Sequence, residues 1–185
     1  MTKAQLTVLA GPTAVGKGTV VAALTKHYPT LKVSVSATTR DPRPGELNGV
    51  HYYFVSPQEF DAMIERGDML EWALVHGKNK YGTPRGPVDE ALNAGHPVLL
   101  EIDLAGARQV RANRPDAQFI FLAPPSWEEL ERRLIGRGTE GPEEQARRLA
   151  TARVELQAAS EFDHVVINDD VERAVDELAR LIGLE

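Results

Sequence analysis

The stretch Gly11-Pro12-Thr13-Ala14-Val15-Gly16-Lys17-Gly18-Thr19 decides the fold of this chain. It follows a short apolar run, Leu6 to Ala10, and leads into Val20 to Leu24, which has the character of a helix start. A strand, a glycine-rich loop and a helix in this order are the context that a phosphate-binding P-loop requires. Gly11 and Gly16 allow the backbone to turn several N–H groups toward one point, which the N-terminus of the next helix also faces.

Lys17 adds a full positive charge that can reach the β and γ phosphates of a nucleotide. The usual pattern has Ser or Thr directly after the lysine, where the hydroxyl binds magnesium. Here Gly18 stands in that place and the hydroxyl comes one residue later, at Thr19. The alternative is a glycine-rich turn before an ordinary helix, with Lys17 merely solvated. Both flanking segments favour the P-loop, so we expect a nucleotide site.

The composition is that of an ordinary globular protein. The chain has 185 residues, of which 42% are hydrophobic, enough for one α/β domain with a small inserted lobe. A formal net charge of −6 argues against binding to polymeric DNA or RNA. There is no cysteine, which excludes disulfides and thiolate metal sites. No signal peptide and no apolar run of about 18 residues is found. We therefore expect a cytoplasmic protein that has no membrane partner.

Strands and helices alternate along most of the chain. Helices are predicted over 17–27, 57–66, 85–94, 105–113, 126–135, 143–160 and 171–182, and strands over 6–10, 31–35, 52–55, 70–75, 97–102, 118–122 and 164–167. This alternation predicts the α/β class, with a parallel sheet that helices cover on both faces. Close-set short strands interrupt the rhythm between about 36 and 85, which predicts an inserted lobe.

The loop from Ser36 to Gly49 is polar and contains two arginines three residues apart, Arg40 and Arg43. Guanidinium groups bind phosphate oxygens in pairs, so these arginines can form an anion clamp. The alternative is a solvated loop in which the arginines pair with its own acids, Asp41 and Glu46.

Carboxylates lie within, or directly after, two of the predicted strands. Glu71 lies in an apolar strand and can accept two hydrogen bonds from a guanine edge, although an exposed strand carboxylate is the simpler interpretation. Glu101 and Asp103 stand at alternate positions at the end of a core strand, where ligands bind in open α/β sheets. Asp103 can hold the water shell of magnesium or a donor of the substrate, and a structural role is equally compatible.

Arginines also mark the glycine-rich loop 136–142 and the helix that follows. Arg137 lies in the loop, and Arg147 and Arg148 lie on the helix. Arginines on a closing loop can neutralise charge on a phosphoryl group during transfer. The alternative is that they pair with neighbouring glutamates, which we favour for Arg147.

Together these motifs resemble the guanylate kinase family, over essentially the whole chain. The specific part is Ser36-x-Thr38-Thr39-Arg40-x-x-Arg43-x-Gly45-Glu46-x-x-Gly49-x-x-Tyr52-x-Phe54, which is similar to the GMP-binding signature of the family. Five further motifs follow in the family's order: Glu71-Trp72-Ala73, Tyr81-Gly82-Thr83, Ile102-Asp103, Arg137-Gly138-Thr139-Glu140 and Ile167-Asn168-Asp169. Two positions depart from the common pattern, with Thr13 in place of serine and Glu101 in place of aspartate.

The resemblance implies a P-loop kinase core (1–35 and 86–185), a GMP-binding lobe (about 36–85) and a lid (about 136–148). It implies transfer of the γ-phosphoryl group from ATP to GMP, with Mg²⁺ accompanying ATP. The ATP site would comprise Gly11, Pro12, Thr13, Ala14, Val15, Gly16, Lys17, Gly18, Thr19 and Asn168. Arg40, Arg43, Tyr52 and Tyr81 would hold the GMP phosphate, and Ser36, Glu71, Thr83 and Asp103 would surround the guanine.

The same resemblance implies that Lys17, Arg43, Arg137 and Arg148 are the catalytic cations. No direct protein ligand to the metal is expected, and Asp103 and Glu101 would lie behind its water shell. Two other functions remain open at this point. One is a kinase for another small phosphorylated acceptor, and the other is a non-catalytic binding module of guanylate-kinase-like form. Lys17 and the lid arginines favour an enzyme, because a binding module has no need of them.

Overall fold

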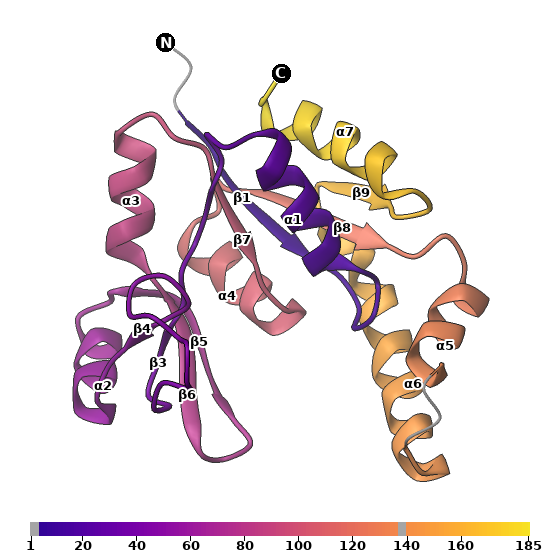
Figure 1. Ribbon diagram of the computed structural model, residues 1–185, viewed down its shortest axis with the longest axis horizontal. Helices are drawn as coiled ribbons and strands as arrows, with labels where there is room; N and C mark the ends of the chain where they lie inside the picture. Colours follow the sequence, from indigo (N-terminus) through magenta and orange to yellow (C-terminus); the bar gives the residue numbers. More distant parts are fainter. Residues whose placement is uncertain (1–3, 137–139) are drawn as a thin grey trace.

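The computed structural model describes residues 4–136 and 140–185, and its core is a five-stranded parallel sheet (Figure 1). The strand order is β2-β7-β1-β8-β9. The strands are β1 (Leu6–Ala10), β2 (Lys32–Val33), β7 (Val98–Glu101), β8 (Gln118–Ala123) and β9 (His164–Ile167). All neighbours in this sheet pair in parallel, so the carboxyl ends of the strands meet at one edge. The parallel sheet expected from the sequence is therefore confirmed.

Helices cover both faces of the core sheet. Leu9 of β1 packs with α1 (Lys17–His27) and α7 (Val171–Ile182) in one hydrophobic cluster. Its neighbour Val8 packs with α3 (Arg85–Asn93) and α4 (Leu104–Asn113) in another. Because successive side chains of a strand point to opposite faces, an unbroken apolar β1 supplies both clusters.

A second, four-stranded sheet lies within residues 37–84, in the order β4-β3-β6-β5. Its strands are β3 (Ala37–Thr38), β4 (Tyr53–Phe54), β5 (Met69–Val75) and β6 (Asn79–Pro84), and helix α2 (Pro57–Glu65) packs on it through the buried Phe60. The β5–β6 and β3–β6 pairs are antiparallel, whereas β3 and β4 run in parallel. The sheet thus differs in type from the core.

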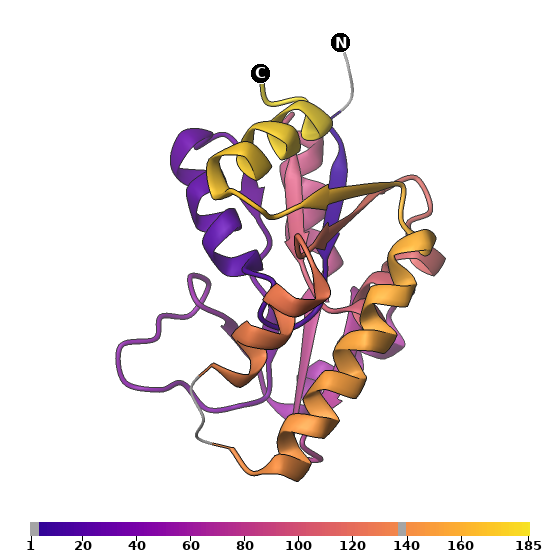
Figure 2. The same cartoon turned by 90° about the vertical axis from the view of Figure 1, so that its right-hand side faces the viewer.

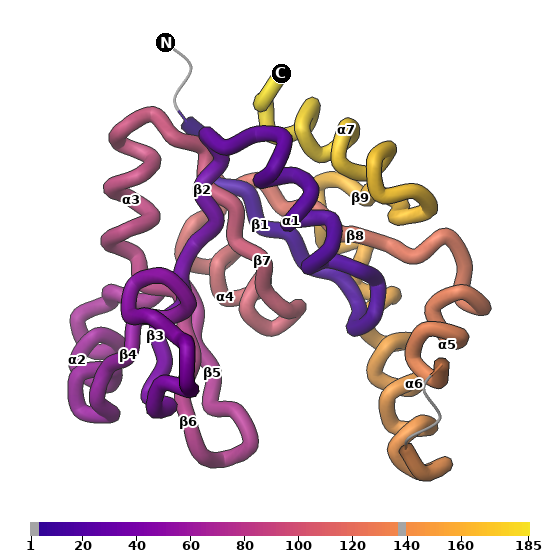
Figure 3. Tube along the Cα trace, viewed as in Figure 1, coloured from indigo at the N-terminus to yellow at the C-terminus, as the bar shows by residue number. Residues whose placement is uncertain are grey.

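Helices α5 (Trp127–Ile135) and α6 (Pro142–Gln157) form a projection that is separate from the small sheet. The short 3₁₀ helix η1 (Ala158–Glu161) follows α6. Leu130, Leu134 and Ala152 form the small core between them. Figure 2 shows α5 beside α6, which is longer and extends beyond it. In the trace of Figure 3 this pair and the small sheet extend from the same end of the core, on opposite sides of the β1–α1 loop. That loop therefore lies between the two projections.

The sequence predicted most of these elements but not all of them. Strands β3 and β6 were not predicted, and the long helix ends at Gln157 rather than near residue 160, where a 3₁₀ turn follows instead. Gly82 explains why β6 is hard to recognise. A Cβ at this position would lie 2.7 Å from the carbonyl oxygen of Glu71, so the close pairing of β5 and β6 requires glycine, a residue that is normally depleted in strands.

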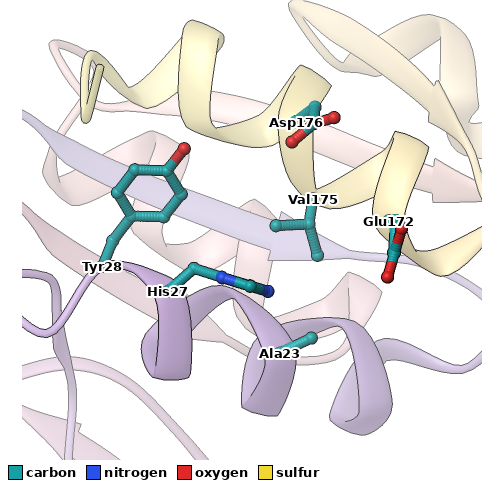
Figure 4. Close-up of a pocket in the computed structure, with 6 residues that line it drawn as sticks. All are labelled: Ala23, His27, Tyr28, Glu172, Val175 and Asp176. Carbon is teal, nitrogen blue, oxygen red and sulfur yellow. The ribbon is translucent and has the colours of Figure 1, made fainter.

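No helix in the described part of the chain is long and apolar enough to cross a membrane. A surface pocket of about 310 Å³ lies between α1 and α7, where His27 and Tyr28 face Glu172 and Asp176 (Figure 4). This pocket is at the C-terminal end of α1 and is therefore remote from Lys17, which begins the same helix.

Candidate active site

The loop between β1 and α1 has a strained backbone and wraps around the ammonium group of Lys17. The Lys17 ammonium donates a hydrogen bond of 2.7 Å to the carbonyl oxygen of Gly11. Gly16, which precedes the helix, has φ of 96°, and Ala14 has φ of 69°. A positive φ is easy for glycine but costs about 1 kcal/mol or more for alanine. Such local strain is typical of a functional loop rather than an ordinary turn.

Two side chains from distant elements hold this loop through one carbonyl group. Asn168, which follows β9, donates from Nδ2 to the Val15 carbonyl oxygen at 2.8 Å. Arg133 of α5 donates to the same oxygen at 3.2 Å. Asn168 is only 4% exposed, and its buried Oδ1 atom has no hydrogen-bond partner within residues 4–136 and 140–185. The Val15 carbonyl therefore joins the loop both to the core sheet and to the α5–α6 projection.

Lys17 lies in an environment with opposing electrostatic effects. Burial lowers its pKa, and three carboxylates oppose this shift, with Glu155 of α6 first, then Glu101 and Asp103. An excess of nearby negative charge keeps an ammonium group charged when water is partly excluded. The site is thus suited to a positively charged Lys17 that awaits an anion.

A second cluster lies where β5 and β6 approach the N-terminus of α4. The Thr83 hydroxyl donates to Glu71 Oε1 at 2.7 Å. The other oxygen, Oε2, faces Gly106, where a Cβ would be only 3.0 Å away. Asp103 caps α4 by accepting from the Gly106 amide at 2.8 Å. Burial raises the pKa of Glu71, the Thr83 hydrogen bond opposes this, and the neighbouring charge of Asp103 adds to it.

A third cluster forms around Arg40 in the loop before β4. Its two terminal nitrogens, Nη1 and Nη2, donate to the two carboxylate oxygens of Glu46 at 2.9 and 3.0 Å. The guanidinium carbon lies 5.2 Å from the ring centre of Tyr52. Tyr81 packs edge-on against Tyr52. Hydrogen bonds from Arg40, and from the backbone amide of Arg43, lower the pKa of Glu46 to about 2. Pairing of Arg40 with an acid of its own loop, one of the alternatives from the sequence, is therefore observed, and it holds the guanidinium beside both tyrosines.

Other residues expected at the site are less constrained. Arg43 is exposed, and Ser36 is half-buried with its carbonyl accepting from the Tyr53 amide. Glu101 and Asp103 are both exposed at the carboxyl edge of the core sheet. The charge of Asp103 raises the pKa of both Lys17 and Glu71. Asp103 therefore lies between the β1–α1 loop (residues 11–19, called the phosphate loop below) and the second cluster around Glu71 (the β5–β6 cluster).

The arginines of α6 are paired with acids. Arg148 contacts Glu140 at 2.6 Å and Glu144 at 3.7 Å, and Arg147 contacts Glu144 at 3.2 Å. The glutamate pairing that we favoured for Arg147 is thus present and extends to Arg148. Both arginines line a pocket of about 280 Å³ together with Thr13 of the phosphate loop. Arg137, the other predicted lid arginine, lies outside the described residues.

Two residues near Lys17 were missed by the sequence analysis, Glu155 and Arg133. Both lie on helices rich in charged residues, where one more glutamate or arginine carries no distinguishing pattern. The spacing along α6 was the only available signal, because Arg148 and Glu155 are two helical turns apart and so share a face.

The described residues include no group of three or more His, Asp or Glu side chains placed to hold a metal ion. Instead, Lys17 has three separate acidic neighbours, Glu101, Asp103 and Glu155. In the described part of the chain, Glu155 Oε1 is a buried acceptor with no partner. This donor set suits Mg²⁺ that arrives with a nucleotide and keeps its water, because Mg²⁺ is usually bound through phosphates, waters and few carboxylates.

Comparisons with known proteins agree with this geometry. The model of the guanylate kinase family matches residues 3–185. Guanylate kinase of Leifsonia xyli subsp. xyli is 62% identical over 96% of this chain and 70% of the relative's length. Guanylate kinase of Thermobifida fusca is 61% identical over 97% of this chain and 91% of its own.

Solved structures give the same result at the level of the fold. The crystal structure of guanylate kinase from Anaplasma phagocytophilum has a TM-score of 0.74 and 32% identity, over 99% of this chain and 86% of that one. Shikimate kinase from Bacteroides thetaiotaomicron, at 14% identity and a TM-score of 0.51 over 97% of this chain and 98% of its own, shares only the fold. Since the family model spans nearly the whole sequence and the relatives are about 60% identical throughout, this chain belongs to the guanylate kinase family.

Proposed function

We propose that this enzyme transfers the γ-phosphoryl group of ATP to GMP, giving ADP and GDP. The observation that carries this proposal is the position of Asp103, which acts on Lys17 of the phosphate loop and on Glu71 of the β5–β6 cluster. A phosphate site and a base-reading site thus share one carboxylate. We assign the core to residues 1–35 and 86–185, the GMP lobe to about 36–85 and the lid to about 136–148.

The ATP half is built on the loop from Gly11 to Thr19. Its backbone N–H groups and the start of α1 favour phosphate oxygens, and Lys17 exchanges its bond to the Gly11 carbonyl for one to a phosphate. Asn168 holds this loop through its hydrogen bond to the Val15 carbonyl oxygen, and in this proposal it lies on the adenine side of ATP.

The GMP half combines the second and third clusters. Arg40, Tyr52 and Tyr81 lie together and supply a charged fork and hydroxyl donors for the GMP phosphate, with the exposed Arg43 completing the clamp. Glu71, an acceptor-only group when ionised, suits the two N–H donors of guanine. Ser36, Thr83 and Asp103 surround the same base in this proposal.

The transfer itself needs no covalent intermediate. An oxygen of the GMP phosphate attacks the γ phosphorus of ATP, and the bond from that phosphorus to the β–γ bridging oxygen breaks, leaving ADP. The attacking oxygen is already anionic, so no strong base is required. Lys17, Arg43 and Arg148, together with Arg137 as predicted from the sequence, offset the charge that spreads over the phosphoryl oxygens. Mg²⁺ that accompanies ATP supplies further charge neutralisation on its phosphates.

Closure is part of this mechanism, because Arg148 is paired with Glu140 and must exchange that partner for a phosphate. Both projections extend past the phosphate loop, one on either side (Figure 3). When they approach each other they exclude water, which would otherwise hydrolyse ATP.

A coupled assay of ADP release tests the proposal, with ATP and each of GMP, AMP, CMP and UMP as acceptor. We expect turnover with GMP to exceed that with the other three by at least about 100-fold, because wrong bases leave a buried carboxylate unpaired. Equal turnover with AMP would indicate a kinase of other specificity. Absence of turnover with all four, with ATP and GMP still bound, would indicate a binding module.

A further inference from the structure

Glu155 is a half-buried acid that the mechanism above does not use. It lies in the last turn of α6, on the helix face that also carries Arg148 and Thr151. Arg148 and Thr151 line the pocket that reaches Thr13 of the phosphate loop. Helix α6 therefore presents a cation near its middle and an anion in its last turn to the same loop.

The Glu155 carboxylate has charged neighbours but no full partner. The groups that face it are the Lys17 ammonium from α1, the Thr13 backbone N–H from the loop and the Asp103 carboxylate from the start of α4. Among the residues that the structure describes, its Oε1 atom is buried and makes no hydrogen bond, whereas the Thr13 N–H donates one to the carboxylate. Lys17 donates to the Gly11 carbonyl instead, and within residues 4–136 and 140–185 it forms no ion pair with an acid.

An acid in this position acts on whatever binds to Lys17. A half-buried carboxylate that accepts one backbone hydrogen bond, from Thr13, and has a buried oxygen without a partner is costly, so it contributes little to holding the fold. The phosphates of a nucleotide bring several negative charges to the same lysine, and in a partly buried site Glu155 repels them strongly. A metal ion on those phosphates cancels part of their charge, and its bound waters can donate to the free Oε1 atom.

We propose that Glu155 makes the ATP site select metal-complexed nucleotide over metal-free nucleotide. The inference rests on the proposed function, since it assumes that ATP phosphates bind at Lys17. Glu155 is a positioning residue in this role. It penalises phosphates that arrive without a metal and accepts hydrogen bonds from the waters of a metal that arrives with them.

The test measures binding without catalysis. Calorimetry with ATP in the absence of GMP is done once with a chelator and once with Mg²⁺, on the wild type and on Glu155→Gln. The amide keeps the shape of the side chain and removes its charge. We expect Glu155→Gln to bind metal-free ATP about tenfold more tightly than the wild type, as loss of one nearby like charge implies. The gain in affinity that Mg²⁺ confers should shrink by about the same factor.

Two further variants serve as controls. Glu143→Gln makes the same change of charge at an exposed position in the first turn of α6, and it should leave both affinities unchanged. Glu155→Asp retains the charge on a shorter side chain, and it should retain the preference for metal-bound ATP. Thermal unfolding of each variant shows whether the fold persists.

The outcomes separate this inference from a structural role and from the proposed function. If Glu155→Gln weakened ATP equally with and without Mg²⁺, the residue would only support the loop and the proposal would be overturned. The same conclusion would follow if Glu155→Asp behaved like Glu155→Gln. A wild type that binds no ATP under either condition would instead contradict the assignment of the ATP site.

Discussion

The side-chain amide of Asn168 donates a 2.8 Å hydrogen bond to the carbonyl oxygen of Val15, which joins two residues 153 positions apart. The bond connects the end of β9 to the middle of the phosphate loop and is buried. The family resemblance of the sequence placed Asn168 in the ATP site without giving it a role in the loop. The structure adds that the same side chain braces the loop that receives the phosphates, so its removal should affect the loop even before a nucleotide binds.

We expect Asn168→Ala to lower kcat/KM for ATP by about tenfold and to leave KM for GMP nearly unchanged. The physical reason is that the Val15 carbonyl loses its buried donor, which costs about 1–3 kcal/mol and loosens the loop. Steady-state kinetics with each substrate varied in turn measure both constants. Equal effects on the two substrates would contradict a local role at the loop.

Asn113→Ala is the matched control, because Asn113 also donates from its amide to a backbone carbonyl, that of Leu70, at 2.9 Å. This bond lies at the C-terminal end of α4, away from the phosphate loop. The two variants should lose similar stability in urea unfolding, and only Asn168→Ala should impair use of ATP.

Gly16 is subject to two constraints, and they can be separated by experiment. Its φ of 96° disfavours any side chain, and a Cβ would lie 2.9 Å from Asn168 Nδ2. Gly95 has a similar φ of 88° but open space around it. Gly16→Ala and Gly95→Ala should each lose about 1 kcal/mol of stability from the backbone. Only Gly16→Ala should also weaken ATP binding, because it displaces the amide from Val15. Calorimetry with ATP decides this, and an unaffected Gly16→Ala would show that the loop tolerates the displacement.

The sequence predicted the β1–loop–α1 unit correctly because its signals are local. An unbroken apolar run, a glycine-rich loop and a helix beginning at Lys17 are all readable without knowledge of the partners. Strand β6 had no such signal, since Gly82 and Pro84 are residues that strands usually avoid. Gly82 is required by the approach of Glu71 from β5, and that approach is a tertiary contact.

The candidate site shows the same division between local and tertiary information. Lys17 and Arg40 stand in motifs whose chemistry can be read from neighbouring residues. Glu155 and Arg133 act at the phosphate loop only because α5 and α6 pack beside it, and nothing in their own segments distinguishes them from solvated charges. The pairing of Arg40 with Glu46 was one of two possibilities at the level of sequence, and only the three-dimensional structure could select it.

Glu71 should show a conflict between stability and binding. Burial raises its pKa, so the folded state disfavours the ionised form. For such an acid, the stability of the free enzyme rises as the pH falls through the folded-state pKa toward the ordinary, unfolded value. Glu71→Gln removes the buried charge and should therefore match or exceed the wild type in thermal stability at neutral pH. The same variant should weaken GMP binding by at least about tenfold, or 1.4 kcal/mol.

The pH dependence of GMP binding follows from the same residue. Guanine donates two N–H groups, which only the ionised carboxylate accepts with both oxygens. KM for GMP should thus rise as the pH falls through the raised pKa of Glu71, and this rise should be absent in Glu71→Gln. Glu59→Gln, on the exposed face of α2, is the control and should keep the wild-type profile. A rise that persists in Glu71→Gln would assign the titration to another group.

Lys17 is the residue on which turnover should depend most strongly. Its ammonium is partly buried, bound to the Gly11 carbonyl and surrounded at a distance by Glu155, Glu101 and Asp103. Lys17→Ala removes the cation whose charge these carboxylates stabilise and which we expect to contact the transferred phosphoryl group, so kcat should fall by about 100- to 1,000-fold or more. The fold should persist, because the lysine contacts a ligand site rather than the hydrophobic core. Lys26→Ala, at an exposed position on the same helix, removes an equal charge and should leave kcat within about twofold of the wild type. Near-normal turnover of Lys17→Ala, measured as ADP release with saturating ATP and GMP, would mean that the β1–α1 loop is not where the phosphoryl group is transferred.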